Sequence, residues 1–401
     1  MGIGLAVGAL LLSACTSSPA KSKPSSSTAV VSKSPYVIHA VMSETGSAAF
    51  LGSREAKVLQ ALTSYENAHG GIDGHPIKLD MKDNESSPSV AVSIATPWVT
   101  SHVPFIIDGA IVGVDAPVDA LAGPTGPVIW DSSPGVHPKP NSYVWSAGIS
   151  TASDAQAYLN FLKAKGLTHI AAITSTDGSG IDGWTQLQNT LKKPAYSGFT
   201  LLTHQTFNPT AVSVSTQLSV IKATHPQALV VWTTGTPFGT VLKGMASLGM
   251  LDIPTITTDG NAIQSELKSF ASFLPRHLYF PLGGLYFSPS LLPPQLRPVI
   301  TTFDRVVKQA GGSPNDAWGL TGSAFLIMVH VVRVLGVHAT AVQMHNYLQT
   351  HIKNYPGLYG MYTMSTTDHR GVHVDALHMA EWNGRSFVPV SGVAGNGPPP
   401  S

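Results

Sequence analysis

The sequence predicts an α/β fold made of two lobes, each built around a central parallel sheet. Short apolar runs alternate with segments of helical spacing through most of the 401 residues, a pattern typical of a parallel sheet covered by helices on both faces. The alternation runs from residue 36 to residue 133 and starts again at residue 153. A chain of this length also exceeds what one hydrophobic core usually serves, so two lobes are expected.

The first series of elements follows from local apolar patterns. Strands are expected where apolar residues form short runs or alternate with polar ones, at 36–42, 76–83, 103–110 and 126–133. Helices are expected at 56–68 and at 87–100, the second with a kink at Pro97.

The second series has the same organisation. Its helices are expected at 153–165, 183–192, 214–224 and 237–248, and its strands at 169–175, 199–207, 228–234 and 254–260. Two long helical segments follow, at 298–310 and 317–335. The glycines of 176–183 are similar to those of a phosphate-binding loop, but the lysine of such a loop is missing. We therefore interpret 176–183 as a loop at the sheet edge where ligands bind.

The only cysteine, Cys15, follows an apolar run from Ile3 to Leu12. One cysteine cannot close a disulfide within its own chain. The run is too short to span a bilayer as a helix, but it suits the core of a secretory signal. Leu12-Ser13-Ala14-Cys15 resembles the lipobox of bacterial lipoproteins, which implies cleavage before Cys15 and lipidation of its sulfur. The alternative is a cysteine buried in an N-terminal strand.

Residues 16–34 are rich in serine and contain two prolines, three lysines and no acid. Such a segment cannot bury enough apolar surface to order itself. We therefore expect a signal peptide at 1–14, then a lipidated cysteine and flexible tether at 15–34. A protein anchored in this way would lie outside the cytoplasm, on the cell membrane.

Composition and motifs argue against several function classes. The net charge is +1 and no basic run occurs outside the tether, so nucleic acid is not an expected partner. The sixteen histidines are scattered, and no zinc-protease, serine-hydrolase or phosphate-loop motif occurs. The stretch 369–378, with His373 and Asp375, looks metal-like, but we interpret it as structural. No catalytic residue, metal or cofactor is expected.

Several segments, taken in order, resemble the solute-binding proteins of branched-chain amino-acid type that feed ABC importers. They lie at 43–62, 66–88, 143–151, 205–235, 248–260 and 359–390. The resemblance implies Rossmann-like lobes joined by three crossing strands, near 143–150, 278–286 and 358–365. Lobe 1 would then be 35–146 plus 284–358, lobe 2 would be 147–283 plus 359–391, and 392–401 would be a disordered tail.

The resemblance also implies a function. The chain would be an extracytoplasmic lipoprotein that closes on a small-molecule solute by a hinge motion and presents it to ABC permease subunits. It is expected to act as a monomer. The alternatives are a ligand-sensing receptor that is not coupled to transport and, less favoured, an enzyme. A receptor would need a membrane helix after the lobes, and the last residues, AGNGPPPS, contain no such apolar stretch.

The candidate ligand-binding residues lie where strands of such a fold end, because ligands bind beyond the carboxyl ends of parallel strands. They are Phe50, Gly113, Trp130, Ser132 and Ser133 in the first lobe, Ser179, Trp232, Thr234 and Asp259 in the second, and Tyr286 at a crossing. By the resemblance, Asp259 would pair with the α-ammonium of an amino acid. The alternatives are a plain Asp-Gly turn for Asp259 and a core position for Trp232.

Two departures from the family pattern widen the range of ligands. Ile111-Val112-Gly113 has no hydroxyl where amino-acid binders of the family hold the carboxylate, and Ser179 stands where a tyrosine is frequent. The ligand is therefore expected to be amino-acid-like, an amide, or an aromatic or short-chain acid, and leucine itself is not required.

Overall fold

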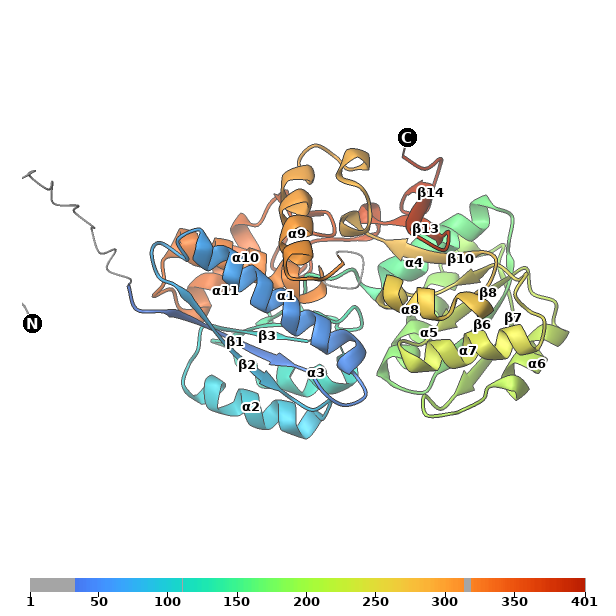
Figure 1. Cartoon of the computed structure of the whole chain (residues 1–401), viewed down its shortest axis with the longest axis horizontal. Coiled ribbons are helices and arrows are strands. Elements are labelled where there is room, and N and C mark those ends of the chain that lie inside the picture. The colour runs from blue at the N-terminus through green and yellow to red at the C-terminus, as the bar shows by residue number, and fades with distance from the viewer. Residues whose placement is uncertain (1–32, 110, 314–318, 401) are drawn as a thin grey trace, which may run out of the picture. The chain divides into compact units, whose positions relative to one another are not determined.

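The computed structural model describes residues 33–109, 111–313 and 319–400. These residues form two α/β lobes, each around its own sheet (Figure 1). The predicted fold, two lobes with mainly parallel sheets, is confirmed. The signal segment, Cys15 and most of the tether lie outside the described residues, and the structure does not test them.

The sheet of the first lobe has five parallel strands in the order β2-β1-β3-β4-β5. They are β1 (Tyr36–Met42), β2 (Ile77–Asp83), β3 (Phe105–Asp108), β4 (Val128–Trp130) and β5 (Val144–Trp145). All four residues of β3 are buried, because helices cover both faces of the sheet, as its uninterrupted apolar run predicts.

Two groups of helices cover this sheet. One face carries α2 (Pro88–Thr100) and α3 (Val112–Asp119), which pack against Val41, Ile106 and Ile129 of the strands. The other face carries α1 (Ala49–Ala68), with α9 (Arg297–Gln309) and α10 (Gly319–Leu335) beside it. The helix α11 (Ala341–His351) packs against α10 and β4. Strand residues alternate between the two apolar clusters, as a pleated strand requires.

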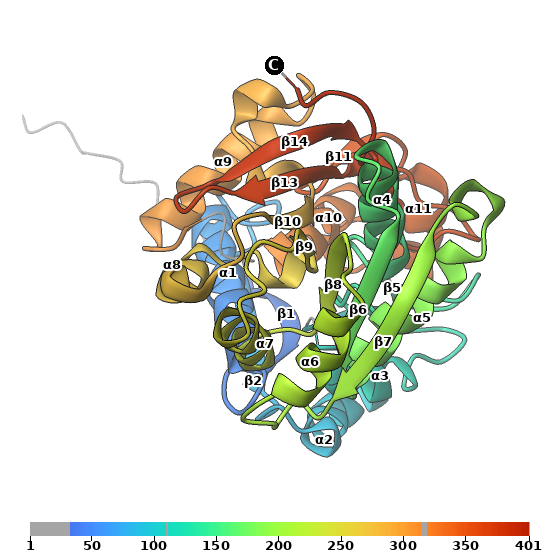
Figure 2. The same ribbon diagram turned by 90° about the vertical axis from the view of Figure 1, so that its right-hand side faces the viewer.

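The sheet of the second lobe has seven strands in the order β14-β13-β10-β9-β8-β6-β7. They are β6 (His169–Ser175), β7 (Thr200–Phe207), β8 (Ala228–Trp232), β9 (Thr255–Ile256), β10 (Leu278–Leu282), β13 (His378–Trp382) and β14 (Phe387–Val393). Strands β6 to β10 are parallel, whereas β13 and β14 are antiparallel additions beside β10 (Figure 2).

Five helices belong to the second lobe: α4 (Thr151–Ala164), α5 (Gly178–Leu191), α6 (Ser215–Ala223), α7 (Thr236–Ser247) and α8 (Gln264–Ser269). Short elements complete the described structure: β11 (Tyr355–Pro356), β12 (Met361–Tyr362), η1 (Pro194–Tyr196), η2 (Asp259–Asn261), η3 (Ala271–Phe273), η4 (Gly284–Tyr286), η5 (Pro289–Leu291) and η6 (Val374–Ala376). The lobes therefore draw on separate stretches of chain, since α9 to α11 return to the first lobe and β13 and β14 to the second. The exact lobe boundaries stay a prediction.

Several elements differ from the sequence-based expectation, among them helices α3 and α11, which were not expected. Helix α1 begins at Ala49, seven residues before the expected start at 56. Helix α5 begins at Gly178, so most of 176–183 is helix and not loop, because Asp177 caps the helix through the Gly180 N–H. The first residues of the expected disordered tail, 392–401, are ordered: β14 runs to Val393, and the Ala394 N–H donates to the carbonyl of Leu377.

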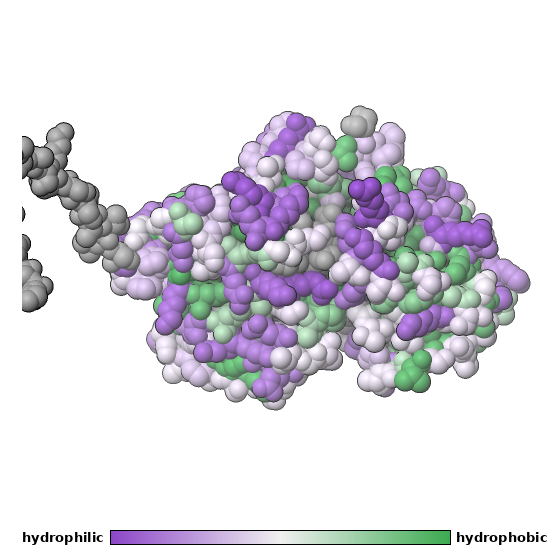
Figure 3. Space-filling model, in the orientation of Figure 1, coloured by the Kyte–Doolittle hydropathy of each residue, from purple (hydrophilic) through white to green (hydrophobic). Residues whose placement is uncertain are grey.

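The outer surface carries few charges, in keeping with 11% charged residues in the chain. Figure 3 shows hydrophilic and hydrophobic residues interspersed over one face, with the hydrophobic ones in small separate groups. None of the helices in the described part combines the length and apolar character that crossing a membrane requires.

Candidate functional site

A cavity of about 420 Å³ lies between the two lobes, at the carboxyl ends of their parallel strands. This volume is within the range of small-molecule sites. Its first-lobe wall consists of Ser47, Ala48, Phe50, Leu51, Ile111, Val112, Gly113, Ser133, Pro134, Gly135 and Leu320. Its second-lobe wall consists of Thr151, Asp177, Gly178, Ser179, Asp182, Pro209, Thr210, Trp232, Thr234, Thr236, Pro237, Thr258 and Gly260.

The parallel topology places these residues together. The chain reaches the cavity each time a strand ends and the next helix begins, at the β1–α1, β3–α3, β6–α5 and β8–α7 connections. Because parallel strands all end on the same edge of a sheet, residues far apart in sequence converge there. Two such edges face each other across the cavity.

Six of the ten expected binding residues lie on the cavity wall: Phe50, Gly113, Ser133, Ser179, Trp232 and Thr234. The structure brings these side chains or backbones to one place. Whether they contact a ligand stays a prediction.

The structure places the other four expected residues away from the wall. Trp130 is completely buried, with its ring centroid 6.2 Å from that of Trp145. The Ser132 hydroxyl donates to the carbonyl of Asp108 at 3.1 Å. Tyr286 is buried edge-on against Phe387, with ring centroids 5.8 Å apart.

Asp259 is buried one layer behind the cavity. Its Oδ1 accepts a hydrogen bond from the Thr258 hydroxyl at 3.1 Å, and its neighbours Thr258 and Gly260 form the wall in front of it. Desolvation raises the pKa of Asp259 to about 6, although the hydrogen bond from Thr258 and the charge of Arg370 oppose the rise.

Two acids on the wall were not among the expected residues, Asp177 and Asp182. Asp177 follows β6 directly and caps α5, with Oδ1 accepting from the Gly180 N–H at 3.0 Å and from the Ser175 hydroxyl at 2.8 Å. Aspartate is a preferred residue at the N-cap of a helix, so Asp177, just after a predicted strand, could have been found from sequence. Asp182 gives no such signal, because only its position on α5 turns it towards the wall.

Trp232 contributes to the wall while most of its side chain packs inside the second lobe. A Cβ atom at Gly183 of α5 would lie 2.2 Å from Cγ of Trp232, so the indole rests directly on the backbone of that helix. The residue is 3% exposed. Most of the Trp232 side chain is therefore part of the core of the second lobe, and only a small part of it reaches the cavity wall.

The two lobes touch each other around the cavity. Phe50 of α1 lies so close to Gly235 that a Cβ there would be 2.9 Å from its ring. His137 Nε2 lies 2.8 Å from Asp182 Oδ1, and Arg54 lies 3.8 Å from Glu266 of α8. These contacts join the two lobes next to the cavity.

The polar groups of the wall are hydroxyls and carboxylates. Among the described wall residues there is no Lys, Arg or His. The remaining wall is apolar, with Phe50 and Trp232 as its aromatic members. Such a site can surround a small solute with an apolar part, but it offers no side-chain cation to a ligand.

A layer of buried acids lies behind the first-lobe wall. Asp108, Asp115 and Asp131 are buried and Asp119 is partly buried; they lie on β3, on α3 and directly after β4. Burial raises the pKa of Asp119 to about 10 and that of Asp131 to about 7, and neighbouring carboxyls add to the rise for Asp119. Burial also raises the pKa values of Asp108 and Asp115 well above normal.

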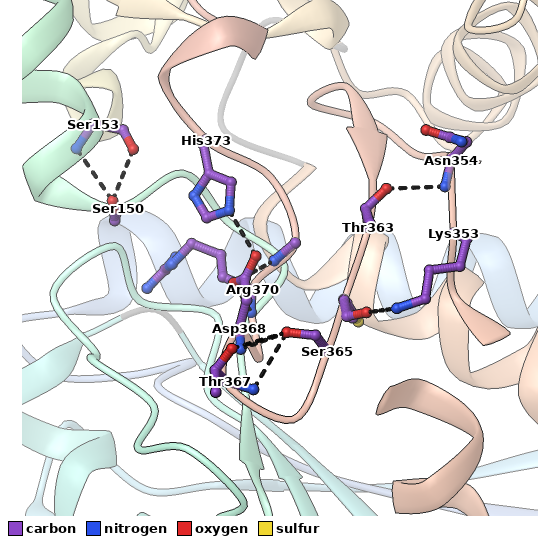
Figure 4. A network of polar contacts seen from close by, with 12 residues as sticks. Ser150, Ser153, Lys353, Asn354, Thr363, Ser365, Thr367, Asp368, Arg370 and His373 are labelled. Atoms are coloured by element: carbon purple, nitrogen blue, oxygen red, sulfur yellow. Dashed lines mark hydrogen bonds and ion pairs between the residues drawn. The ribbon is translucent and has the colours of Figure 1, made fainter. Parts of the chain in front are cut away.

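Arg370 lies after β12 and links that segment to residues 136–148. Its guanidinium donates to the Ser146 hydroxyl at 3.0 Å and to the carbonyls of Gly148 and Val136. Burial lowers its pKa to about 10, against the opposing charge of Asp131. Figure 4 shows Arg370 beside the loop that contains Asp368, with the dashed contacts of that loop.

The metal-like stretch 369–378 has other contacts in the structure. His373 Nε2 lies 2.7 Å from Asp368 Oδ2 (Figure 4). The ring of His369 stacks on Trp145, with centroids 3.9 Å apart. Across residues 33–109, 111–313 and 319–400, no group of three or more His, Cys, Asp or Glu side chains is arranged to hold a metal ion.

Comparisons with known proteins agree with this architecture. A family model described as periplasmic binding protein matches residues 37–386. No curated protein sequence matches the chain. Among solved structures, an extracellular ligand-binding receptor from Rhodopseudomonas palustris HaA2 is similar, with a TM-score of 0.77 and 20% identity over 89% of this chain and 100% of that one.

Two similar structures carry more specific descriptions. One is the branched-chain amino acid transporter substrate-binding protein LivJ from Streptococcus pneumoniae in complex with isoleucine, with a TM-score of 0.73 and 18% identity over 88% of this chain and 98% of that one. The other is the leucine-binding protein LivK from Thermotoga maritima, with a TM-score of 0.71 and 16% identity over 88% and 97%. At such identities the likeness shows the fold.

Proposed function

Because this chain belongs to the periplasmic binding protein family, we propose that it captures a small solute between its lobes and delivers it to an ABC importer. The observation that carries the proposal is the cavity whose wall comes from both lobes. A solute in that cavity contacts both lobes only when they are closed. Binding then shifts the molecule towards the closed state by the difference in affinity between closed and open forms.

The wall supports an amino-acid-like solute or an amide with an apolar body. Phe50 and Trp232 lie on it from opposite lobes, and Ser133, Ser179 and Thr234 place hydroxyls around it. Aromatic surfaces bind apolar groups, while hydroxyls orient polar ones. Simple aromatic and short-chain acids are less well supported, since the described wall residues include no Lys or Arg to meet their charge.

The remaining parts of the proposal concern the location and the partners of the protein. We propose that it lies outside the cytoplasm as a monomer that is tethered to the membrane through lipid on Cys15. We also propose that the permease subunits recognise its closed form. The similar branched-chain amino acid transporter protein LivJ supports transport coupling. The similar structure described as an extracellular ligand-binding receptor keeps a sensing role as the second candidate.

The proposal is tested by binding and closure together. The purified full chain is titrated calorimetrically with amino acids, amides, and aromatic and short-chain acids, and its radius of gyration is measured by X-ray scattering with and without each binder. We expect at least one solute to bind and to reduce the radius of gyration. If no solute of these classes binds, or if binding leaves the scattering unchanged, capture by closure is wrong.

The importer assignment has its own test. Ligand-loaded protein should stimulate ATP hydrolysis by the permease and ATPase of a candidate ABC importer, in membrane vesicles, more than the ligand-free protein does. Closure without any such stimulation would favour the sensing role.

A further inference from the structure

We propose that the cavity selects its solute by a positively charged nitrogen, held by Asp177 and Asp182, and that a carboxylate on the solute is dispensable. This inference rests on the proposed function, because it concerns the same cavity. It differs from the expectation drawn from sequence, in which Asp259 meets the nitrogen and hydroxyls hold a carboxylate.

The two carboxylates approach the cavity from the beginning of α5. Both hydrogen bonds that Asp177 accepts within the protein, from the Gly180 N–H that it caps and from the Ser175 hydroxyl, go to Oδ1. Its Oδ2 is therefore left for a solute. Asp182 bonds His137 through Oδ1, while its Oδ2 is buried without a hydrogen-bond partner. That oxygen lies beside Gly135, where a Cβ would be 3.4 Å from it, and Gly135 is itself on the wall.

No cationic side chain among the described residues of the cavity wall balances the negative charges of Asp177 and Asp182. The nearest partner of Asp182, His137, is half-exposed. Burying a carboxylate without a cation is costly, and lobe closure buries Asp182. A cationic solute supplies the missing charge, so closure is more favourable with it than with an empty cavity.

A carboxylate on the solute would find part of its usual partners already engaged. In this fold it would depend on backbone N–H groups at helix starts, and many of those groups around the cavity already have acceptors in the protein. These are the N–H groups of Ala48, Ile111, Ser133, Gly135, Gly180, Gly235 and Gly260.

The layer beneath the cavity floor adds to the preference for a cation. Asp154 lies in the first turn of α4, whose first residue, Thr151, is on the wall, and both of its carboxyl oxygens are buried without a hydrogen-bond partner. Asp259 lies behind Thr258 and Gly260, with Oδ2 likewise unpartnered. Burial raises the pKa of Asp154 well above its usual range and so keeps that carboxyl uncharged. The negative charge of Asp259, which Arg370 partly offsets, opposes an anionic group in the cavity and attracts a cationic one. Phe50 and Trp232 add aromatic surfaces that also attract cations.

The test uses matched sets of probes. One set is L-phenylalanine, phenethylamine, which lacks the carboxylate, and hydrocinnamate, which lacks the nitrogen. The other is L-leucine, isoamylamine and isocaproate. By calorimetry on the full chain, we expect each amine of a binding set to bind at least as tightly as its amino acid. We expect the acid to bind at least about tenfold more weakly, the minimum for losing a charge-assisted hydrogen bond.

Two isosteric variants locate the nitrogen. Asp177→Asn keeps an oxygen that can cap α5, and Asp182→Asn keeps an oxygen for His137, so each removes charge with little change of shape. Each should weaken amine binding by about tenfold to a hundredfold and leave any binding of the acids unchanged or tighter. Asp252→Asn is the matched control, because Asp252 is 71% exposed and forms no part of the wall.

His137→Ala separates charge recognition from lobe contact, since it breaks the bond to Asp182 without removing a carboxylate. It should weaken all binders by a similar factor. The inference is overturned if an acid binds as tightly as its amine, if the amino acid binds and the amine does not, or if Asp182→Asn merely reproduces His137→Ala. An acid that binds and closes the lobes would leave the proposed function standing, whereas no binding by any probe would contradict both.

Discussion

Arg370 shows how much of the polar interior depends on a single residue. It is 5% exposed, joins its own segment to residues 136–148 through hydrogen bonds to Ser146, Gly148 and Val136, and carries a positive charge near the buried carboxyl of Asp131. Removing one member of a buried polar network leaves the others without partners, which costs more than the network contributes as a whole.

The variant Arg370→Met should therefore destabilise the fold by about 3–5 kcal/mol, measured as the free energy of unfolding in urea. Arg276→Met is the control, because Arg276 pairs with Asp252 at 2.9 Å on the surface and is 76% exposed. Exposed pairs contribute little, so this variant should unfold like the unmodified protein. Equal losses in both variants would contradict the role given to Arg370.

At this scale the sequence predicted part of the candidate site. Strand ends can be recognised from apolar runs, so residues next to them, such as Ser133 and Thr234, were placed near the wall. The direction of a side chain after a strand depends on its neighbours: the Ser132 hydroxyl turns to the carbonyl of Asp108, and Asp259 turns behind Thr258. Asp108 belongs to another strand, and even the adjacent Thr258 does not reveal in the sequence which way the Asp259 side chain turns.

At the scale of elements, the shape of the cavity depends on how helix α5 packs against strand β8. Gly183 lets the helix backbone approach the indole of Trp232, since a Cβ there would lie 2.2 Å from two of its ring atoms. A glycine inside a helix is unfavourable by itself, so this close approach offsets that cost.

Gly183→Ala should destabilise the protein by about 1–3 kcal/mol through overpacking, although alanine is the better helix former. Gly113→Ala in α3 is the comparison, because a Cβ there meets no atom within 4 Å, and it should not destabilise. Urea unfolding of both variants measures the difference. A Gly183→Ala variant as stable as Gly113→Ala would show that the indole moves aside freely.

Elements were easier to predict than their ends. The buried strands stand out as apolar runs, and β1 and β6 begin and end at the predicted residues. The start of α1 was missed because its first turn contains Gly52, and glycine is a poor helix former. The structure needs glycine there, since a Cβ at residue 52 would lie 2.2 Å from the carbonyl oxygen of Ser43. Helix α3 was not predicted, since Pro117 lies within its eight residues and proline usually interrupts a helix.

For the molecule as a whole, the restart of the strand–helix pattern predicted two lobes. It did not predict how closely they approach, because that depends on contacts such as those of Phe50 with Gly235 and His137 with Asp182. These pairs are distant in the chain and belong to no local pattern.

The buried acids should make the stability of the whole molecule decline in alkaline solution. Burial raises the pKa of Asp119 to about 10, so between the unfolded value of about 4 and pH 10 the folded chain keeps a proton that the unfolded chain releases. Stability therefore falls as pH rises through this range. Histidines with lowered pKa values, such as His345 at about 4, act below pH 6.5 and do not affect the alkaline side.

We expect the melting temperature to fall from pH 7 to pH 9, measured by calorimetry in buffers of equal ionic strength. Asp119→Asn should flatten this slope, because the amide cannot titrate. Asp252→Asn, which removes an exposed carboxylate, should leave the slope unchanged. A flat profile for the unmodified protein would show that these carboxyls do not hold protons at neutral pH.

The polar contacts across the cavity also bear on kinetics. Arg54 with Glu266 and His137 with Asp182 both lie partly in water, where dissolved ions weaken attraction between charges. If the proposed solute leaves only after these pairs separate, its residence time should shorten as salt concentration increases. The protein would then retain its solute longest at low ionic strength and release it faster at high salt concentration.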